Sequence, residues 1–484
     1  MLEAHAHKQL KKLLKQSSDD WPHNLTLARL VARSLRRRDH TFIEIGIGSE
    51  SFWWIGLLVP LCIENLSVVL VLSSKQRFQL INVELPKLKK EGLEIQIWEG
   101  NDPPPGKQLW LIEQESLIAN YKKGLLKSRQ LIIPEAENLT SFLRDSLSLK
   151  IIPDDWEELR RLNPSMDTLI LDIYERLSRK LFSQSVSFKT SVSMEYEEII
   201  ALKDIIRILR SSPNKWSNIV NIGTSGWASW AELDPDILSW IWNIKPLKPL
   251  LKTNSLFIDL PTIFLSTYNH KSIKNLLFCE LSEASCPIDV HVNLSGEVFH
   301  EPLPLFAPKC QPLPNTEFFL QHLSDSCKRL ILGLPGITII LIDDSLLRTQ
   351  ITSLLAAEFG VRVVHEVLSS DINGVICCSW SWWLDHYVYL PAPQQLIIGL
   401  FPIPSLSSPL VASQVEYLKC LGKDWFRELL LPESLKTITK AISPVRKNCS
   451  RLAILDGRLW ARSWGETFLN LLEPYILLKH LLPD

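Results

Sequence analysis

Short apolar runs alternate with segments of helical periodicity along most of the chain. Residues 41–45, 67–72, 375–378 and 396–401 are such runs, and turn-forming residues bound them. Continuous apolar runs of this length predict buried strands. Because helical segments follow the runs, we expect an α/β fold with a sheet in each half of the chain. An aromatic loop is expected to join the run at 375–378 to the run at 396–401.

The middle of the chain has a different pattern. From residue 143 to about residue 252, leucine and isoleucine recur at three- and four-residue spacing, most clearly at 167–182 and 195–210. This spacing predicts helices, and strand signals are few there. Nearer the N-terminus, residues 2–16 are expected to form a surface helix, and Pro22 is expected to open the next one. We therefore expect a helical domain between two α/β parts.

Composition narrows the range of functions. With 484 residues, the chain is long enough for two or three domains. A net charge of −1 gives no overall attraction to nucleic acid, so any such binding must come from local patches. The nine cysteines show no C-x-x-C spacing, which speaks against a zinc site or a disulfide framework. The longest apolar stretch, residues 52–62, is about half a membrane span. A cytoplasmic protein without a membrane partner is expected.

A family resemblance begins in the second half of the chain. After the apolar run at 375–378 come Ser379, Ser381, Trp382 and Trp383, and the next run ends in a proline-rich exit of Phe401, Pro402, Pro404, Pro409 and Leu410. This order resembles the second lobe of the DinG/XPD-like superfamily-two DNA helicases, which reads T-x-S-F-W and then L-P-F-x-x-P-x-x-P-L. Further motifs follow the family order from Trp21 to Pro474.

The resemblance implies two RecA-like lobes with a helical, arch-like insertion in the first lobe. Its motifs give residues 1–142 as the main part of the first lobe, 143–252 as the insertion, 253–275 as the return to the first lobe, 276–325 as a connection and 326–484 as the second lobe. The family activity is ATP-dependent DNA unwinding. ATP and Mg²⁺ are implied as cofactors by the resemblance alone.

The positions that resemble the nucleotide-binding motifs are altered. In register with A-G-T-G-T-G-K-T, the loop after residue 45 keeps two glycines and a small hydroxyl residue, while Glu50 replaces a glycine, Ser51 the lysine and Phe52 the metal-binding Ser/Thr. An asparagine replaces the adenine-contacting glutamine upstream. The remnant nucleotide positions are Asn24, Gly46, Gly48, Ser49 and Ser51.

The charge of the loop after residue 45 determines whether it can bind a triphosphate. Two unit charges about 4 Å apart interact by roughly 4 kcal/mol at an effective dielectric constant near 20. Losing the lysine and gaining Glu50 both oppose a polyanionic triphosphate. Each tenfold change in affinity corresponds to about 1.4 kcal/mol. We therefore expect this loop not to work as a catalytic phosphate loop.

Two further motifs lack the residues that catalysis needs. In the segment that resembles D-E-A-H, Pro134 takes the place of the metal-binding Asp, Glu135 is kept, and Glu137 replaces His. In the segment that resembles Q-G-x-G-R-x-x-R, Lys440 takes the Gln place and Pro444 the first Arg place, with Arg446 one residue from the second. The remaining catalytic candidates are Glu135 and Arg446, and no metal ligand set is expected.

The interval between the phosphate loop and the acidic motif has no cysteine after Cys62, although the iron–sulfur members of the family carry four there. No iron–sulfur cluster is therefore expected. The resemblance also implies nucleic-acid contacts in both lobes. The candidates are Ser73, Ser74, Lys75 and Arg77 in the first lobe and Ser379, Ser381 and Trp383 in the second. The expected partner is single-stranded DNA, and protein partners are a further possibility.

Three functions are compatible with these features. The first is a helicase-family protein that has lost ATP turnover and acts as a DNA-binding or complex-forming subunit. The second is an active ATP-dependent DNA helicase with unorthodox ligands. The third, suggested by the near-neutral charge and the 17 tryptophans, is a protein-interaction scaffold that does not bind DNA.

Overall fold

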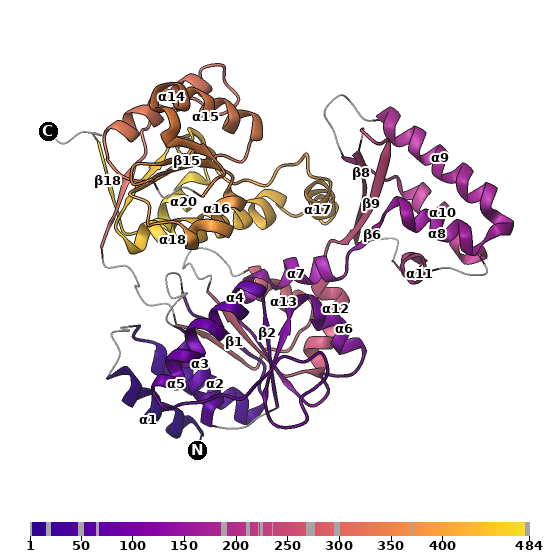
Figure 1. Ribbon diagram of the computed structural model, residues 1–484, viewed down its shortest axis with the longest axis horizontal. Coiled ribbons are helices and arrows are strands. Elements are labelled where there is room, and N and C mark those ends of the chain that lie inside the picture. Colours follow the sequence, from indigo (N-terminus) through magenta and orange to yellow (C-terminus); the bar gives the residue numbers. More distant parts are fainter. Residues whose placement is uncertain are drawn as a thin grey trace.

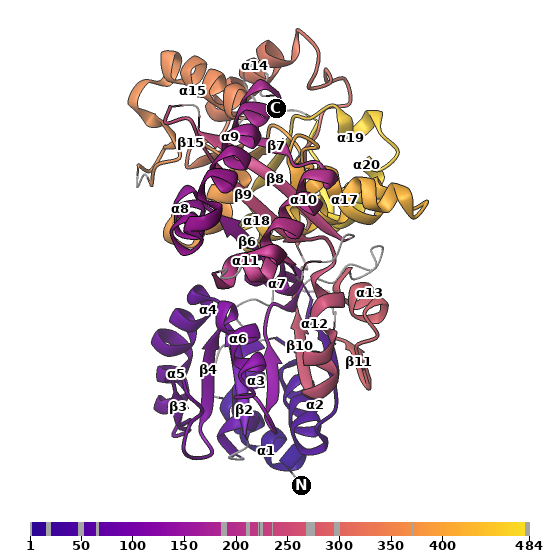
Figure 2. The same cartoon turned by 90° about the vertical axis from the view of Figure 1, so that its right-hand side faces the viewer.

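The computed structural model describes residues 2–15, 21–46, 53–63, 67–184, 191–209, 213–220, 222, 226–234, 236–267, 276–294, 301–368 and 371–479. Two α/β lobes lie one above the other, and a third unit projects from the first lobe beside the second (Figure 1). The side view separates the first lobe below from the second lobe and the projecting unit above (Figure 2).

The first lobe is built on a seven-stranded sheet of order β11-β1-β10-β5-β2-β4-β3. Every pairing in it is parallel. The strands are β1 (Thr41–Glu44), β2 (Val68–Leu72), β3 (Ile97–Trp98), β4 (Leu109–Glu113), β5 (Gln130–Ile133), β10 (Thr262–Ser266) and β11 (Val290–Asn293). The predicted apolar strands near the N-terminus are confirmed.

Helices cover both faces of this sheet. Alternate residues of a strand enter two separate cores, as Ile43 and Phe42 of β1 do, because successive side chains point to opposite faces. This explains why the strands are continuous apolar runs. The helices are α1 (Leu2–Leu14), α2 (Asn24–Arg37), α3 (Trp53–Ile63), α4 (Ser74–Gln79), α5 (Leu85–Lys90), α6 (Leu117–Lys122), α7 (Leu139–Ser146), α12 (Pro249–Asp259) and α13 (Leu276–Glu283).

The insertion leaves the first lobe after α7 and returns before α12. It contains the predicted helices, α8 (Pro153–Leu162), α9 (Asp167–Gln184), α10 (Tyr196–Ile208) and α11 (Asn214–Val220). It also contains a four-stranded antiparallel sheet of order β6-β9-β8-β7, which the helical pattern did not predict. Its strands are β6 (Leu149–Ile151), β7 (Ser191–Ser193), β8 (Trp227–Asp234) and β9 (Ser239–Pro246). Trp240, Trp242 and Ile244 alternate along β9 and are buried against the helices.

The second lobe has a seven-stranded sheet of order β14-β15-β13-β16-β17-β12-β18, again parallel throughout. Its strands are β12 (Leu303–Phe306), β13 (Thr338–Leu341), β14 (Val363–His365), β15 (Val375–Cys378), β16 (Gln395–Ile398), β17 (Arg451–Ile454) and β18 (Tyr475–Leu477). Its helices are α14 (Phe319–Leu332), α15 (Ser345–Phe359), α16 (Trp380–His386), α17 (Pro409–Cys420), α18 (Leu431–Lys447), α19 (Arg458–Ala461) and α20 (Gly465–Leu471).

Two local expectations need correction. The aromatic stretch after β15 is the helix α16 rather than a loop, because the Ser379 side chain accepts a hydrogen bond from the Trp382 amide and caps the first turn. The segment 276–325, expected as a connection, contributes β11 to the first sheet and β12 to the second. The chain therefore passes between the lobes after β11.

No helix in the described ranges combines the length and the apolar character needed to cross a bilayer.

Candidate functional site: the cleft between the lobes

The turn after β5 carries the altered acidic motif to the second lobe. Glu135 starts this turn in the left-handed backbone region, at φ 47°. Glu137 follows in a single 3-10 turn and is 8% exposed. Its carboxylate accepts hydrogen bonds from the Thr267 hydroxyl at 2.5 Å and from the Thr267 amide at 3.2 Å. Thr267 follows β10, the strand beside β5 in the sheet, so the segments after two neighbouring strands meet inside the first lobe.

Two lysines of α18 complete this cluster from the second lobe. The Lys440 ammonium lies 3.6 Å from Glu137 Oε1 and donates to Asn138 Oδ1 at 3.2 Å. The Lys436 ammonium donates to the backbone carbonyl of Glu137 at 2.8 Å. Lys440 occupies the place of the family's glutamine. The altered acidic motif of the first lobe and the altered arginine motif of the second are therefore joined directly by protein groups.

This cluster does not have the composition of a magnesium or triphosphate site. Pro134, at the metal-binding place, is buried and has no side-chain oxygen. The Glu137 carboxylate is already satisfied by Thr267 and Lys440. In the described residues no group of three or more His, Cys, Asp or Glu could hold a metal ion. The described residues of this cluster thus do not fit a triphosphate with Mg²⁺.

Arg446 does not face this cluster as a finger residue would. It is 6% exposed, and its guanidinium donates to the carbonyl oxygens of Leu472, Glu473 and Pro474, the last at 2.8 Å. Burial lowers the pKa of Arg446 to about 10. The geometry assigns Arg446 to bracing the C-terminal segment of the second lobe.

The remaining nucleotide-motif candidates are only partly described. Asn24 is fully buried, and its Nδ2 donates to the Trp21 carbonyl at 3.3 Å. A Cβ on Gly56 would lie 3.3 Å from Asn24 Oδ1, so α2 and α3 are in close contact there. Gly46 ends the described part of the phosphate-loop segment at φ 92°. Gly48, Ser49 and Ser51 lie outside the described residues.

In the first lobe, the nucleic-acid candidates surround the start of α4. Ser73 and Gln76 form a capping box, with the Ser73 amide donating to Gln76 Oε1 at 2.9 Å. Ser74 is exposed. The Arg77 guanidinium is held by Glu99 and, at 3.0 Å, by Glu113. Two of the four candidates therefore already use their donors within the lobe.

Lys75 reaches the other lobe. Its ammonium lies 4.8 Å from the ring centroid of Tyr387, which follows α16 in the second lobe. A cation over an aromatic face is attracted by the ring quadrupole, by roughly 0.5–1 kcal/mol at an exposed site. This contact is a second direct link between the lobes.

The candidates of the second lobe divide into surface and core residues. The Ser379 amide and hydroxyl donate to Glu366 Oε1 at 2.9 and 2.6 Å, and Ser381 is exposed beside it. Trp383 is fully buried, and its indole N–H donates to the Ala441 carbonyl at 3.0 Å. Trp383 is thus a core residue and is removed from the candidate nucleic-acid contacts.

Glu366 is held in an unusual environment. Burial alone would raise the pKa of Glu366, but the hydrogen bonds from Ser379 and the nearby charge of Arg348 hold it below its ordinary value. Its backbone lies in the left-handed region, at φ 50°. A carboxylate therefore occupies the donors that the resemblance assigned to a DNA phosphate.

Comparison with known proteins agrees with this architecture. The structure titled "XPD_APO" aligns with a TM-score of 0.61 and 13% identity, covering 94% of this chain and 100% of that one. The structure titled "Structure of S. tokodaii Xpd4" aligns with a TM-score of 0.60 and 12% identity, covering 93% and 97%. The chain has the fold of the DinG/XPD-like helicases.

Sequence similarity is confined to part of the chain. ATP-dependent DNA helicase YoaA of Haemophilus influenzae is 25% identical over 126 residues, which are 25% of this chain and 20% of that protein. YoaA of Escherichia coli is 27% identical over 124 residues, with the same coverage. The matched part thus spans about a fifth of these relatives' own length. No family model matches the sequence.

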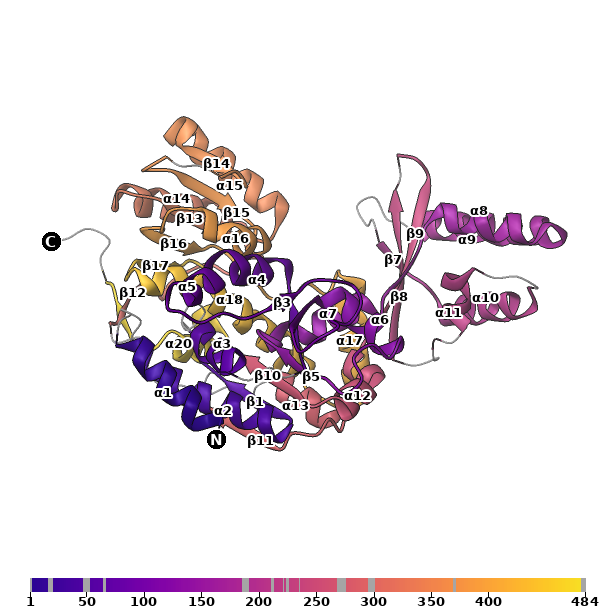
Figure 3. The ribbon, with the colours of Figure 1, turned by 60° about the horizontal axis from the view of Figure 1, so that its bottom comes forward.

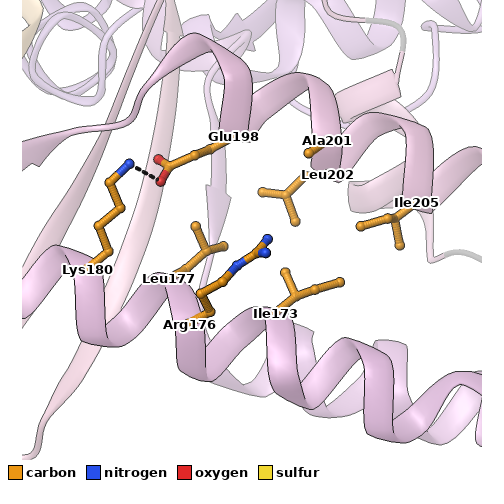
Figure 4. Close-up of a pocket in the computed structure, with 8 residues that line it drawn as sticks. All are labelled: Ile173, Arg176, Leu177, Lys180, Glu198, Ala201, Leu202 and Ile205. Atoms are coloured by element: carbon orange, nitrogen blue, oxygen red, sulfur yellow. Dashed lines mark ion pairs between the residues drawn. The ribbon is translucent and has the colours of Figure 1, made fainter.

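Cavities also lie elsewhere in the described part of this XPD-like fold. One of about 260 Å³ lies between α9 and α10 of the insertion, with Ile173, Leu177 and Leu202 along it and the Lys180–Glu198 ion pair of 2.8 Å at its edge (Figure 4). A larger one of about 540 Å³ lies between the lobes, against α13, α17, α18 and α20. Neither is lined by the residues of the Glu137 cluster.

The pairing of Glu137 with Lys440 was missed at the sequence level, although both replacements were visible. A histidine became an acid in one motif, and a glutamine became a base in another. Complementary changes of charge in motifs that the XPD-like fold brings together are the signal that could have found it. Lys436 gave no such signal, since it does not fall on a charged motif position.

Proposed function

We propose that this chain is a DinG/XPD-like protein that does not turn over ATP and acts as a nucleic-acid-binding or complex-forming subunit. The observation that carries the proposal is the interlobe cluster of Glu137, Thr267, Lys436 and Lys440. In this cluster, the altered acidic motif of the first lobe and the altered arginine motif of the second bind one another.

The electrostatics of the cluster support the loss of turnover. A lysine at the position of Lys440 would attract a phosphate only if its charge were free, and Glu137 lies 3.6 Å away. Burying a charge costs less when it is paired and hydrogen-bonded, so separating this pair to admit a triphosphate is unfavourable. Ser51, Pro134 and Pro444 supply neither cation, metal ligand nor finger at their three places.

The nucleic-acid part of the proposal rests on the surface groups that remain. Ser74, Lys75 and Ser381 are exposed, on the two lobes. The relatives are named as DNA helicases, and a single strand of DNA is the partner we propose. None of the nine cysteines is in a disulfide, and a cytoplasmic location is part of the proposal.

An ATPase assay with and without single-stranded DNA tests the loss of turnover. The full chain and its Glu135→Gln variant are compared under the same conditions, because Glu135 is the one catalytic-type carboxylate kept. We expect equal, background rates for both. DNA-stimulated hydrolysis that Glu135→Gln abolishes would instead establish an active ATP-dependent helicase.

A protein-interaction scaffold without DNA binding is the second candidate. It is favoured by Arg77, whose guanidinium is held by Glu99 and Glu113, and by Ser379, whose donors are held by Glu366. Phosphate contacts release counterions, so DNA binding must weaken as salt rises. Salt-dependent binding of a fluorescent oligonucleotide supports the first candidate, whereas absence of binding even at low salt supports the scaffold.

A further inference from the structure

The β8–β9 hairpin of the insertion has two apolar faces. One face, with Ala231, Leu233 and Trp242, packs against the helices of the insertion. The other face presents Ala228 and Trp230, which are 1% and 6% exposed although no helix of the insertion shares their cluster. Alternating side chains of a strand must bury each face separately. Something outside the insertion therefore covers the second face.

That cover is α17 of the second lobe. Leu410 and Tyr417, seven residues apart and so on one face of the helix, pack against Ala228, Trp230 and Leu247. Figure 1 shows α17 between the second lobe and the hairpin, and Figure 3 shows the same neighbourhood from below. Val415 and Leu418, on other sides of α17, are also buried. The helix thus lies between two parts of the chain.

Ion pairs bracket this contact. Glu283, at the end of α13 in the first lobe, lies 3.0 Å from the Lys248 ammonium at the base of the insertion and 3.1 Å from the Lys423 ammonium just after α17. The three groups are partly exposed, so they add specificity more than strength. Leu247 and Tyr417 also line the cavity between the lobes. First lobe, insertion and second lobe therefore meet at one place.

We propose that the β8–β9 hairpin is a strut that holds α17 and fixes the distance between the two lobes. The insertion is rooted in the first lobe at both ends, after α7 and before α12. If the second lobe moved away, α17 would slide off Trp230 and expose both apolar surfaces to water, which is unfavourable. The strut is made of other residues than the Glu137 cluster, so it does not rest on the proposed loss of ATP turnover.

Hydrogen exchange of the full chain tests the strut, because the hairpin and α17 should each protect the other from exchange. Tyr417→Asp is expected to speed amide exchange in the hairpin peptide 227–246 about tenfold, and Trp230→Ala is expected to do the same in 409–420, because each element protects the other. Leu421→Asp is the matched control, since Leu421 follows α17 and is 53% exposed. It should change neither peptide.

If Tyr417→Asp or Trp230→Ala does not fold, the milder variant Leu410→Ser still tests the proposal. Small-angle scattering of this variant should show a larger radius of gyration than the wild-type chain, with unchanged circular dichroism. The proposal is overturned if Tyr417→Asp and Leu410→Ser alter exchange only within α17, while the hairpin peptide and the radius of gyration stay as in the wild type.

Discussion

The carboxylate of Glu137 in the first lobe lies 3.6 Å from the ammonium of Lys440 in the second. These residues stand where the related motifs have histidine and glutamine, and their side chains join the two lobes directly. The Thr267 hydroxyl and amide donate hydrogen bonds to the same carboxylate from within the first lobe. Glu137, Thr267 and Lys440 therefore form one cluster that spans both lobes.

Glu137→Gln should destabilise the protein by about 1–3 kcal/mol, because it removes one charge from a largely buried pair and leaves Lys440 unmatched. Urea unfolding gives the free energy. Glu433→Gln is the control, since the Glu433 carboxylate is 46% exposed and 3.9 Å from Lys436, and it should cost less than about 0.5 kcal/mol. Equal effects of the two substitutions would contradict the interface.

Trp383→Ala should cost about 3–5 kcal/mol, because the side chain is fully buried and its indole N–H bonds the Ala441 carbonyl. Ser381→Ala, on the exposed side of the same helix, should change the free energy of unfolding by about 0.5 kcal/mol or less. Chemical denaturation of both variants checks this. A stable Trp383→Ala protein with weakened DNA binding would mean that the indole is a surface group.

Glu366→Gln should make stability less dependent on pH in the acid range. The Ser379 hydrogen bonds outweigh burial and lower the pKa of Glu366, so its ionised form is favoured in the folded state. This contribution is present above the ordinary glutamate pKa of about 4.3 and is lost as pH falls through the lower, folded value. The variant should thus be less stable at neutral pH and approach the wild type in acid.

Thermal unfolding across this range measures the effect. Glu358→Gln serves as control. The Glu358 carboxylate also forms an ion pair, 2.7 Å from the Lys328 ammonium, but its side chain is 44% exposed. A constant gap between Glu366→Gln and the wild type at every pH would show that the carboxylate does not gain its stability from Ser379.

The lobes could be predicted from the sequence because their parallel strands are short apolar runs, such as Val375–Cys378, buried on both faces. The β8–β9 hairpin could not, because its turn lacks the usual Asn-Gly signal. Leu238 takes the positive φ of 49° that the turn requires. Without that signal, the alternation of Trp240 and Trp242 did not stand out, and the whole region was predicted to be helical.

The site was predicted only in part for a different reason. The altered motif positions were visible one by one, but the contacts of Glu137 and Lys440 depend on how the two lobes are packed. Similarly, Ser379 is a small hydroxyl residue in the sequence, and only the fold shows that Glu366 occupies its donors. The sequence shows which motif residues are replaced, whereas only the packed structure shows which contacts the replacing residues make.

Calorimetric titration of ATP with Mg²⁺ into the full chain tests the loss of the nucleotide site most directly. With the cleft closed by Glu137 and Lys440, we expect no saturable heat up to about 1 mM nucleotide, a limit that corresponds to about −4 kcal/mol of binding free energy. Saturable binding at lower concentration, weakened in Glu135→Gln, would contradict this and make the cleft a working nucleotide site.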